Sequence, residues 1–490
     1  MTEHEIHSVL GIGFGPANLS LAVTLEELGY TGSTRFVERA ADFQWQDEQL
    51  IDGADIQNNP FRDLTMPRNT GSAYTFVNYL ASQGRLTDYL HLNAKFPLRR
   101  EYAGYLRWVA DSFRDAVDYG RSATRLTVTD TADGEVFRLE TDDGRQYLGE
   151  TVVIGTGRSP RIPPVFRRSL GPTVFHATRY LSSLRRLRGR ALRVAVVGGS
   201  QSAIEIVLDL LGRDDVAQVV SVQRGIGFRL KDTSPYSRRV FLPEFIDYFY
   251  PLPAETKRRI RAELRSINYA ACDQDVIDRL ATVQHEYELK GSDRLRLMPF
   301  SEVSEAAPHG DGGVHRLVVR DVNNDTRSVY DADVVVLATG FRDFGLGPDD
   351  EPYHPLLADV ADRLALTEEG IPAVARDYSV PVARRSYGSR PLRLYLNGLC
   401  EASHGMGDAG ALAVLSARST DIVESLMLEP EGVSGPDGLP APARALEPDR
   451  VPDRTPVRVL EPGALVPDHG IGDIGDIEDI GDLVPDEALR

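Results

Sequence analysis

The stretch that decides the fold is the glycine-rich turn Gly11-Ile-Gly13-Phe-Gly15-Pro16-Ala-Asn18, near the start of the chain. An apolar run at residues 7–12 precedes it and predicts a buried strand. Apolar residues then recur at helical spacing over residues 19–28, and residues 35–38 predict a second strand that ends in an acid. This strand–turn–helix–strand pattern is typical of a dinucleotide-binding unit. Its glycines let a pyrophosphate approach, and the helix N-terminus donates hydrogen bonds to it.

A second unit of the same kind lies at residues 192–223. An apolar strand leads into the turn Gly198-Gly-Ser200-Gln201-Ser202, and a helix and a further strand follow. The second strand of this unit ends in Gln223-Arg224, whereas its counterpart in the first unit ends at Glu38. An acid at this place suits a free ribose 2′-hydroxyl, and an arginine can accommodate a 2′-phosphate. The first unit is therefore predicted to bind FAD and the second to bind NADPH.

Two more strands end in a glycine turn, at residues 152–157 and 334–340, where the chain would cross between the two nucleotide domains. The predicted fold is α/β, with two Rossmann-like dinucleotide-binding domains and an inserted, mainly helical substrate element. On its first helix, Arg258, Arg259, Arg261 and Arg265 predict a solvated face. The expected organisation is a first part of the FAD domain at residues 1–185, the NADPH domain at 186–231 and 291–338, the helical element at 232–290, a second part of the FAD domain at 339–428, and a tail at 429–490.

The tail accounts for most of the chain's acidity. The 490 residues hold 55 Lys and Arg against 73 Asp and Glu, a net charge of −18. Residues 429–490 contain 15 acids and 5 bases, so they carry −10 of that charge. Ten prolines and repeated Ile-Gly-Asp units there predict an acidic disordered extension. The overall negative charge argues against a nucleic-acid partner or an anionic membrane surface.

Cysteine content and the absence of targeting signals limit the possible cellular compartment and the possible metal sites. Cys272 and Cys400 are too few for a disulfide framework, and they form no CxxC pair or Cys-rich metal site, so we expect no metal. The first residues lack the basic and apolar regions of a signal peptide, and no apolar run approaches the roughly 20 residues that span a bilayer. These features predict a cytoplasmic protein without a membrane partner.

The chain resembles the flavin-dependent N-hydroxylating monooxygenases, the family of the ornithine and lysine N-hydroxylases of siderophore assembly, in a set of short segments: Phe43-Gln-Trp45, residues 57–64, 72–80, 84–86, 99–102 and 105–108, Asp232-Thr-Ser-Pro235, Phe249-Tyr250, Asn268-Tyr269, Ala338-Thr-Gly340 and residues 401–405. The likeness runs from Val9 to about Met427. It implies that NADPH reduces FAD, that O2 adds to the flavin to form a C4a-hydroperoxyflavin, and that NADP+ stays bound while an unprotonated amine of a small amino acid takes the distal oxygen. It also implies a homo-oligomer, a dimer or a tetramer.

The resemblance assigns Gln57 to the neighbourhood of the flavin and the reactive oxygen, which makes it the candidate catalytic residue. A buried amide that braces a turn is the alternative role for Gln57. The residues expected to bind the cofactors are Gly11, Gly13, Gly15, Pro16, Asn18, Glu38, Trp45, Gln57, Gly198, Ser200, Gln201, Ser202, Arg224, Thr339 and Gly340.

Several substrate positions depart from the ornithine pattern. Arg62 stands where the ornithine enzymes carry a lysine that contacts the substrate carboxylate. Ser237 and Arg238, followed by Arg239, replace an asparagine and an acid, and residues 406–415 hold no serine, while Asn268 is retained. Arginine binds carboxylates through a planar fork and stays charged, so these changes favour a substrate with more than one carboxylate. The expected substrate is L-aspartate, oxidised to N-hydroxyaspartate and on to nitrosuccinate, as in the branch of the family that feeds nitrogen–nitrogen bond formation. The expected substrate-binding residues are Arg62, Ser237, Arg238, Arg239 and Asn268.

Three alternatives remain open. In the first, Arg62 replaces the lysine conservatively, and the enzyme hydroxylates the side chain of ornithine or lysine. In the second, the chain is a Baeyer–Villiger-type or sulfur-oxidising flavin monooxygenase, which would not need the matches at residues 57–64 and 78–86. In the third, it is an FAD-binding scaffold without catalytic activity.

Overall fold

The computed structural model describes residues 5–92, 94–132, 134–187, 191–310, 313–383 and 392–428. These residues belong to the first of two units of the chain, Met1–Pro440; the second is Ala441–Arg490. The predicted acidic tail at 429–490 lies outside the described residues.

The first sheet has eight strands and contains the first glycine turn. Its main order is β15-β16-β6-β1-β2-β3, and β5 joins β6 to β4. β1 pairs in parallel with both β2 and β6, and β6 pairs in parallel with β16, so their carboxyl ends share one edge of the sheet. The strands are β1 (Ile6–Ile12), β2 (Thr34–Val37), β3 (Val117–Asp118), β4 (Ala123–Thr131), β5 (Gly134–Thr141), β6 (Gln146–Ile154), β15 (Ser379–Pro381) and β16 (Arg393–Leu396).

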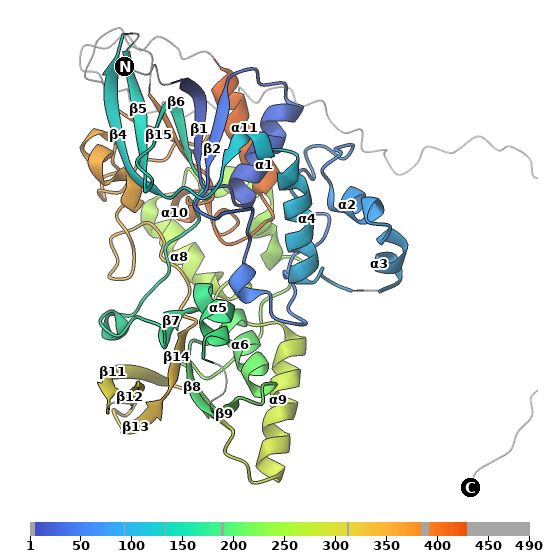
Figure 1. Cartoon of the computed structure of the whole chain (residues 1–490), viewed down its shortest axis with the longest axis vertical. Coiled ribbons are helices and arrows are strands. Elements are labelled where there is room, and N and C mark those ends of the chain that lie inside the picture. Colours follow the sequence, from blue (N-terminus) through green and yellow to red (C-terminus); the bar gives the residue numbers. More distant parts are fainter. Residues whose placement is uncertain are drawn as a thin grey trace, which may run out of the picture. The chain divides into compact units, whose positions relative to one another are not determined.

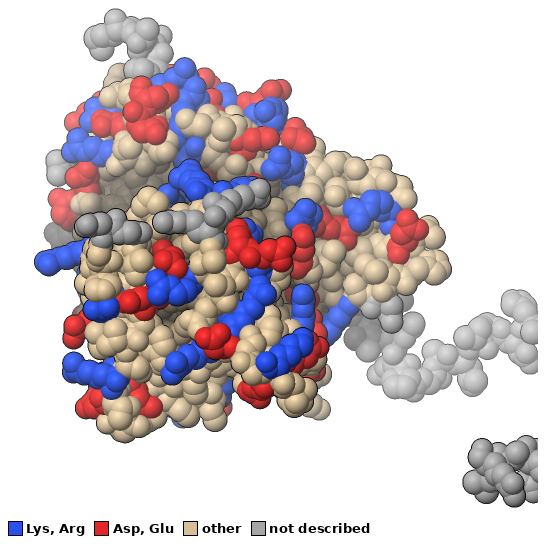
Figure 2. All heavy atoms as spheres, turned by 60° about the horizontal axis from the view of Figure 1, so that its bottom comes forward, with Lys and Arg blue, Asp and Glu red and all other residues tan. Residues whose placement is uncertain are grey.

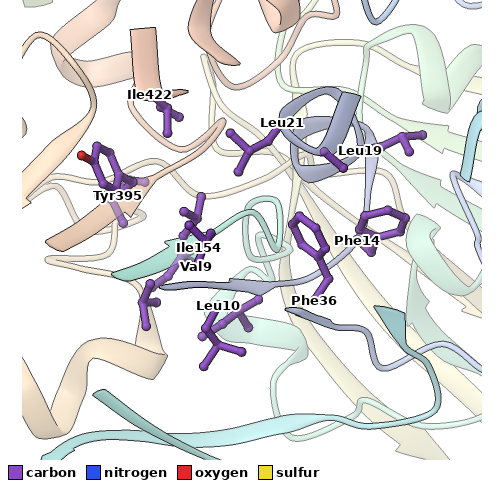
Figure 3. Packing of buried hydrophobic residues seen from close by; sticks show 14 of the residues in the cluster. Val9, Leu10, Phe14, Leu19, Leu21, Phe36, Ile154, Tyr395 and Ile422 are labelled. Carbon is purple, nitrogen blue, oxygen red and sulfur yellow. The ribbon is translucent and has the colours of Figure 1, made fainter. Parts of the chain in front are cut away.

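Helices α1 (Pro16–Glu27) and α11 (Leu415–Met427) pack against each other and against this sheet. Figure 3 shows Leu21 of α1 and Ile422 of α11 on one side of the strands that carry Val9 and Ile154. Leu10 lies on the other side, because successive side chains of a strand point to opposite faces. All five of these side chains are buried. The first turn therefore rests on a closely packed core.

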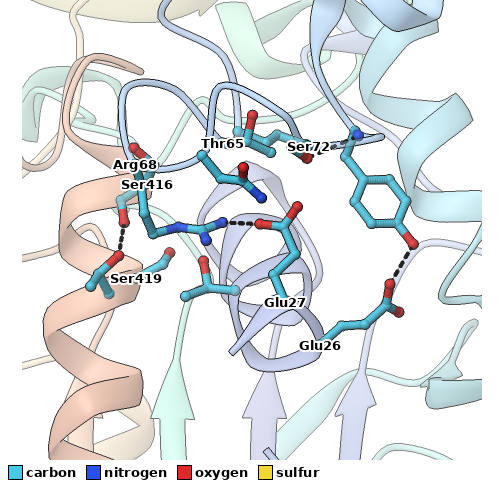
Figure 4. Close-up of polar contacts among 12 residues, drawn as sticks. Glu26, Glu27, Thr65, Arg68, Ser72, Ser416 and Ser419 are labelled. Atoms are coloured by element: carbon cyan, nitrogen blue, oxygen red, sulfur yellow. Dashed lines mark hydrogen bonds and ion pairs between the residues drawn. The ribbon is translucent and has the colours of Figure 1, made fainter. Parts of the chain in front are cut away.

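Polar contacts attach the loop after Leu64 to α1 and α11 (Figure 4). Arg68 forms an ion pair with Glu27 of α1, and the Ser416 hydroxyl donates to the Met66 carbonyl at 2.7 Å. Beyond this loop, α2 (Phe76–Ser82), α3 (Leu86–Leu92) and α4 (Arg99–Asp111) follow in the chain. α2 and α4 are joined through an aromatic cluster: Phe76, Tyr79, Tyr102 and Tyr105.

The second sheet is fully parallel, in the order β10-β9-β8-β14-β7. Its strand β14 is a continuous, fully buried apolar run, as expected for a parallel sheet covered on both faces. α6 (Gln201–Leu211) and α9 (Gln274–Leu289) cover one face (Figure 1). A three-stranded antiparallel sheet packs on the other: β11 (Ser301–His309), β12 (Val314–Asp321) and β13 (Arg327–Ala332). The parallel strands are β7 (Val174–His176), β8 (Leu192–Val197), β9 (Val216–Val222), β10 (Leu295–Met298) and β14 (Val334–Leu337), and α5 (Tyr180–Arg185) follows β7.

One expected boundary is wrong. Residues 1–185 were predicted to belong to the first nucleotide domain, yet β7 is a strand of the second sheet, with Val174 paired to Val335 of β14. The three residues of β7 are all buried, so they complete the second core. The chain therefore enters the second sheet before Val174.

The segment at 232–290 is mostly helical, as expected, but it does not build a large core of its own. It contains α7 (Pro243–Phe249), α8 (Ala254–Glu263) and α9, while the short α10 (Glu401–His404) lies later in the chain. Val240, Phe241 and Ile267 form a small apolar cluster, whereas Leu280 of α9 joins the core beneath the second sheet.

The fold is thus α/β with two Rossmann-type sheets, which confirms the predicted class. Lys and Arg side chains intermingle with Asp and Glu side chains over the face drawn in Figure 2. None of the described helices combines the length and apolarity that a membrane crossing requires.

Candidate active site

A cavity of about 2400 Å³ receives the glycine turns of both sheets. Gly13 and Gly15 of the first unit line it, and so do Gly198 and Ser200 of the second. The carboxyl ends of parallel strands are the usual place for ligands in such sheets, so this cavity is the candidate active site.

The first turn fits a pyrophosphate. Gly15 lines the cavity, and a Cβ built on it would meet no described atom within 4 Å. α1 begins at Pro16, and no described side chain caps its N-terminus, so its first N–H groups are free for a ligand. Gly13 has a φ of 82°, in the left-handed region that favours glycine. Gly13, Gly15 and Pro16 thus lie where the cofactor was predicted.

Gly11 and Asn18 do not line the cavity. A Cβ on Gly11 would lie 2.2 Å from Cδ1 of Phe36, so the glycine makes room for the neighbouring strand. The buried Asn18 donates from Nδ2 to the Gly13 carbonyl at 2.7 Å and accepts from Asn397 at 3.0 Å. Both residues were expected to contact the cofactor. In the structure they lie on the side of the turn that faces the core, where Gly11 packs against Phe36 and Asn18 supports the backbone of Gly13.

Glu38 and Trp45 line the cavity as expected. The Glu38 carboxylate accepts from the backbone N–H groups of Phe14 at 2.7 Å and Ala40 at 2.8 Å. These bonds hold the carboxylate at the end of β2, where a ribose hydroxyl would approach.

In the second turn, the backbone approaches β14 very closely. A Cβ on Gly198 would lie 2.2 Å from the Ala338 carbonyl oxygen. Ser200, the N-cap residue of α6, makes no side-chain capping bond, and Gln201 and Ser202 line the cavity beside it. Thr339 and Gly340 line it as well. Arg224 is exposed at the cavity and has no ion-pair partner among the described residues, which suits a 2′-phosphate.

Gln57 lies at the centre of a polar cluster that the sequence did not reveal. Its Nε2 donates to Asp273 at 2.8 Å, and its Oε1 accepts from Lys231 at 3.3 Å. Its backbone N–H donates to Asp55 at 2.9 Å, and its φ is 53°. Burial raises the pKa of Asp55 to about 6 and lowers the pKa of Lys231. The asparagines and glutamines of a chain are numerous, and no local pattern predicts which one contacts residues about 200 positions away.

Arg62 and Arg238 line the same cavity. Neither guanidinium has a hydrogen bond or an ion pair with the described residues. Burial lowers the pKa of Arg62, and the positive charge of Arg238 lowers it further; Arg238 also contributes to lowering the pKa of Lys231. Arg62 and Arg238 are thus two neighbouring cations without an anionic partner among the described residues, and they suit an anionic group of a substrate.

Ser237 and Arg239, also expected at the substrate, do not line the cavity. Ser237 donates a side-chain hydrogen bond to Asp232, which lowers the pKa of that carboxyl, and Arg239 is exposed. Both belong to a 3₁₀ turn, Ser237–Phe241, in which consecutive side chains point in different directions. Of the three residues 237–239, only Arg238 lines the cavity.

Asn268 lines the cavity, and its Nδ2 is buried without a hydrogen-bond partner among the described residues. Gly410, in the segment that lacks serine, comes close to it: a Cβ there would lie 2.5 Å from Asn268 Nδ2. A buried N–H without a partner is costly, so Asn268 is suited to donate to a ligand.

One arginine of α8 contradicts the expectation of a solvated face. Arg261 pairs with Asp343 at 2.8 Å and with the buried Glu401 at 3.3 Å. Arg158 pairs with the same Asp343 at 2.7 Å, and Tyr269 donates to Glu401. The cluster joins four segments that are distant in the chain and lie in the cavity wall. Charges removed from water need partners, so each of these charges is paired across segments.

Two dinucleotide turns that open into one cavity, with an amide and unpaired cations nearby, define a two-nucleotide flavin oxidoreductase. A family model described as L-lysine 6-monooxygenase/L-ornithine 5-monooxygenase matches residues 5–343. The chain belongs to this family of flavin-dependent N-hydroxylating monooxygenases. Its cofactors are FAD and NADPH, and O2 is its co-substrate.

Individual relatives agree over most of their length. The L-ornithine N(5)-monooxygenase of Burkholderia cepacia is 33% identical over 419 residues, which cover 83% of this chain and 91% of the relative. A solved ornithine N-hydroxylase of Kutzneria sp. 744, with reduced FAD, NADP+ and L-ornithine, has a TM-score of 0.78 at 32% identity and covers 86% of this chain and 99% of its own. The L-lysine 6-monooxygenase of Pseudomonas syringae has a TM-score of 0.75 at 32% identity, with the same coverage.

Proposed function

We propose that the chain hydroxylates the side-chain amine of a diamine amino acid, with L-ornithine and L-lysine as the first substrates to test. The observation that carries the proposal is the near-complete coverage of ornithine and lysine N-monooxygenases by this chain. The balanced reaction consumes one amine, one O2, one NADPH and one proton, and releases one hydroxylamine, one NADP+ and one water.

FAD, when bound, supplies the activation of O2 with electrons from NADPH. The residues of the chain bind the substrate and orient it toward the flavin. In this proposal Arg62, which lines the cavity, binds the substrate carboxylate, and the unpaired Nδ2 of Asn268 donates a hydrogen bond to the substrate. Gln57 offers an amide to the reacting oxygen.

The unpaired guanidiniums of Arg62 and Arg238 favour a second candidate. A dicarboxylic amino acid, L-aspartate first, could place one carboxylate on each, and its α-amine would be oxidised to N-hydroxyaspartate and in later rounds to nitrosuccinate. The three relatives named above are ornithine and lysine enzymes, so the diamine has priority.

Aerobic NADPH oxidation with ornithine, lysine and aspartate, followed by mass analysis of the products, distinguishes the two. The diamine proposal expects one oxygen on the side-chain nitrogen of ornithine or lysine and no conversion of aspartate. Coupled oxidation of aspartate alone would replace it with the second candidate. Oxygen on carbon or sulfur of another substrate would overturn both.

A variant pair sharpens the assay. Arg238→Ala should leave a diamine substrate within about threefold of its kcat/KM, because one carboxylate needs one arginine, but should lower the kcat/KM of aspartate at least about tenfold. Arg259→Ala is the matched control, since Arg259 is exposed on α8 and does not line the cavity. Homo-oligomerisation remains a prediction, which light scattering tests.

A further inference from the structure

A short strand pairing brings two charged side chains to the same place beside Gln57. Leu230 and Cys272 form an isolated parallel bridge. The Lys231 N–H donates to the Cys272 carbonyl and the Cys272 N–H to the Arg229 carbonyl, each at 2.8 Å. The next residue on each strand, Lys231 and Asp273, therefore lies beside its counterpart. Both contact the Gln57 amide.

The chemistry of these two partners leaves the amide one orientation. An ionised carboxylate only accepts hydrogen bonds, and an ammonium only donates them. Nε2 of Gln57 must therefore face Asp273, and Oε1 must face Lys231, as the distances of 2.8 and 3.3 Å show. An amide nitrogen carries two hydrogens, so one N–H of Gln57 remains for a ligand in the cavity.

A chain of contacts then connects this amide to the second nucleotide turn. The backbone N–H of Asp273 donates to Oε1 of Gln201 at 2.9 Å, and Nε2 of Gln201 donates to Glu205 at 3.0 Å. Gln201 is the first residue of α6, at the turn expected to hold NADPH. The buried Glu205 forms an ion pair with the buried Arg99 at 2.9 Å. This ion pair fixes Glu205, the last residue in the series of contacts.

We infer that Asp273 is a positioning residue that fixes the Gln57 amide and couples it, through Gln201, to occupancy of the NADPH turn. The inference rests on the proposed function in that Gln57 serves oxygen chemistry there. Binding of the nucleotide at α6 restricts the motion of the Gln201 side chain. Because Gln201 contacts Asp273 and Asp273 contacts Gln57, the motion of Asp273 and of the Gln57 amide is then restricted as well. When the contact is lost, more electrons from NADPH reduce O2 to hydrogen peroxide; this side reaction consumes NADPH, a proton and O2.

The first test needs no turnover. In the FAD-loaded, full-length protein, NADP+ should slow amide hydrogen exchange both at residues 198–204 and in a peptide that contains Gln57. In Asp273→Ala, the protection at 198–204 should remain and the protection at Gln57 should be lost. Asp275→Asn is the matched control, because Asp275 is an exposed acid in the first turn of α9, the helix whose N-cap residue is Asp273. Equal protection of the Gln57 peptide in Asp273→Ala and in the unaltered protein would overturn the inference.

The second test measures hydrogen peroxide formed from NADPH without any amino acid. Asp273→Ala should raise its rate about fivefold, Gln57→Ala should raise it similarly, and the double variant should go no further, because Asp273 acts through Gln57. Asp273→Asn, which retains an acceptor and the shape of the side chain, should restore part of the difference and serves if the alanine variant does not fold. Multiplying effects in the double variant would overturn the inference. Failure of the proposed function shows separately, as the absence of N-hydroxylated product with the unaltered protein.

Discussion

Gly410 approaches Asn268 so closely that a Cβ on the glycine would lie 2.5 Å from the Asn268 amide nitrogen. That nitrogen is buried and has no partner among the described residues. The glycine therefore leaves space beside a buried donor that has no hydrogen-bond partner among the residues the structure describes. Gly410 would also bring a Cβ within 2.4 Å of the Tyr269 hydroxyl, so even one methyl group must displace this pair.

Gly410→Ala is expected to raise the KM for the amino-acid substrate about tenfold, because a shift of Asn268 would remove the hydrogen bond that we propose it donates to the substrate. NADPH oxidation without substrate should change little, since the nearest atoms to a Cβ at this position belong to Tyr269 and Asn268 and not to the nucleotide turns. Steady-state kinetics measure both. Gly71→Ala is the control, because its Cβ would find its nearest neighbour at 3.7 Å. An unchanged KM in Gly410→Ala would show that Asn268 does not bind the substrate.

Arg224→Ala is expected to raise the dissociation constant of NADPH about tenfold and to leave the dissociation constant of NADH unchanged. The reason is that a guanidinium can pair with the 2′-phosphate, which only NADPH carries. The measurement is flavin reduction by each nucleotide under anaerobic conditions, with Arg259→Ala as the control. A preference for NADPH that is the same in both variants would remove Arg224 from the nucleotide site.

Arg418→Met is expected to lower the free energy of unfolding by about 3–5 kcal/mol, because it leaves a buried carboxylate without its partner. Arg418 and Asp408 have side chains only 1% and 0% exposed, and their ion pair is 2.8 Å long. Nε of Arg418 also donates to Asn397 at 2.7 Å, and Asn397 holds Asn18 behind the first glycine turn. Urea unfolding measures the loss, and the fraction of protein that retains FAD should fall with it. A loss below about 1 kcal/mol would contradict this account.

Asp55→Asn is expected to gain stability relative to the unaltered protein as the pH rises from 4 to 7. Burial raises the pKa of Asp55 to about 6, above its value of roughly 3.9 in an unfolded chain. Between these values the folded state holds the proton more strongly, so ionisation costs stability as the pH rises. The asparagine does not ionise, so the difference in unfolding free energy should shift by about 2 kcal/mol in its favour across that range. Denaturation curves at several pH values measure it, and a difference independent of pH would refute the raised pKa.

The parts that could be predicted from the sequence are those that depend on neighbours along the chain. The turns at Gly13 and Gly198 are visible because a strand, a glycine turn and a helix follow one another, and this order alone produces a nucleotide-binding edge. Glu38 and Arg224 could be placed for the same reason, since each stands at the end of a predicted strand. The motifs at residues 57–64 and 401–405 indicated the family of N-hydroxylating monooxygenases to which the chain belongs.

Other residues could not be assigned from the sequence. Gln57 and Asp273 are 216 positions apart, and their contact depends on how the two sheets and the helical segment pack. Gly11 and Asn18 belong to the predicted motif, yet they face the core, since the side chains around a tight turn point to different sides. Arg261 looked like one of several solvated arginines until the fold brought Asp343 and Glu401 to it.

The amino-acid sequence by itself thus determined the α/β class, the two dinucleotide turns and the family, because these follow from local periodicity and from motifs that are contiguous in the chain. Only the tertiary structure decided which charges face the cavity. It placed Arg62, Arg238 and Lys231 there and left Arg239 in solvent. The physical reason is that the direction of a side chain and its partner across the fold depend on packing between distant segments, which no local pattern encodes.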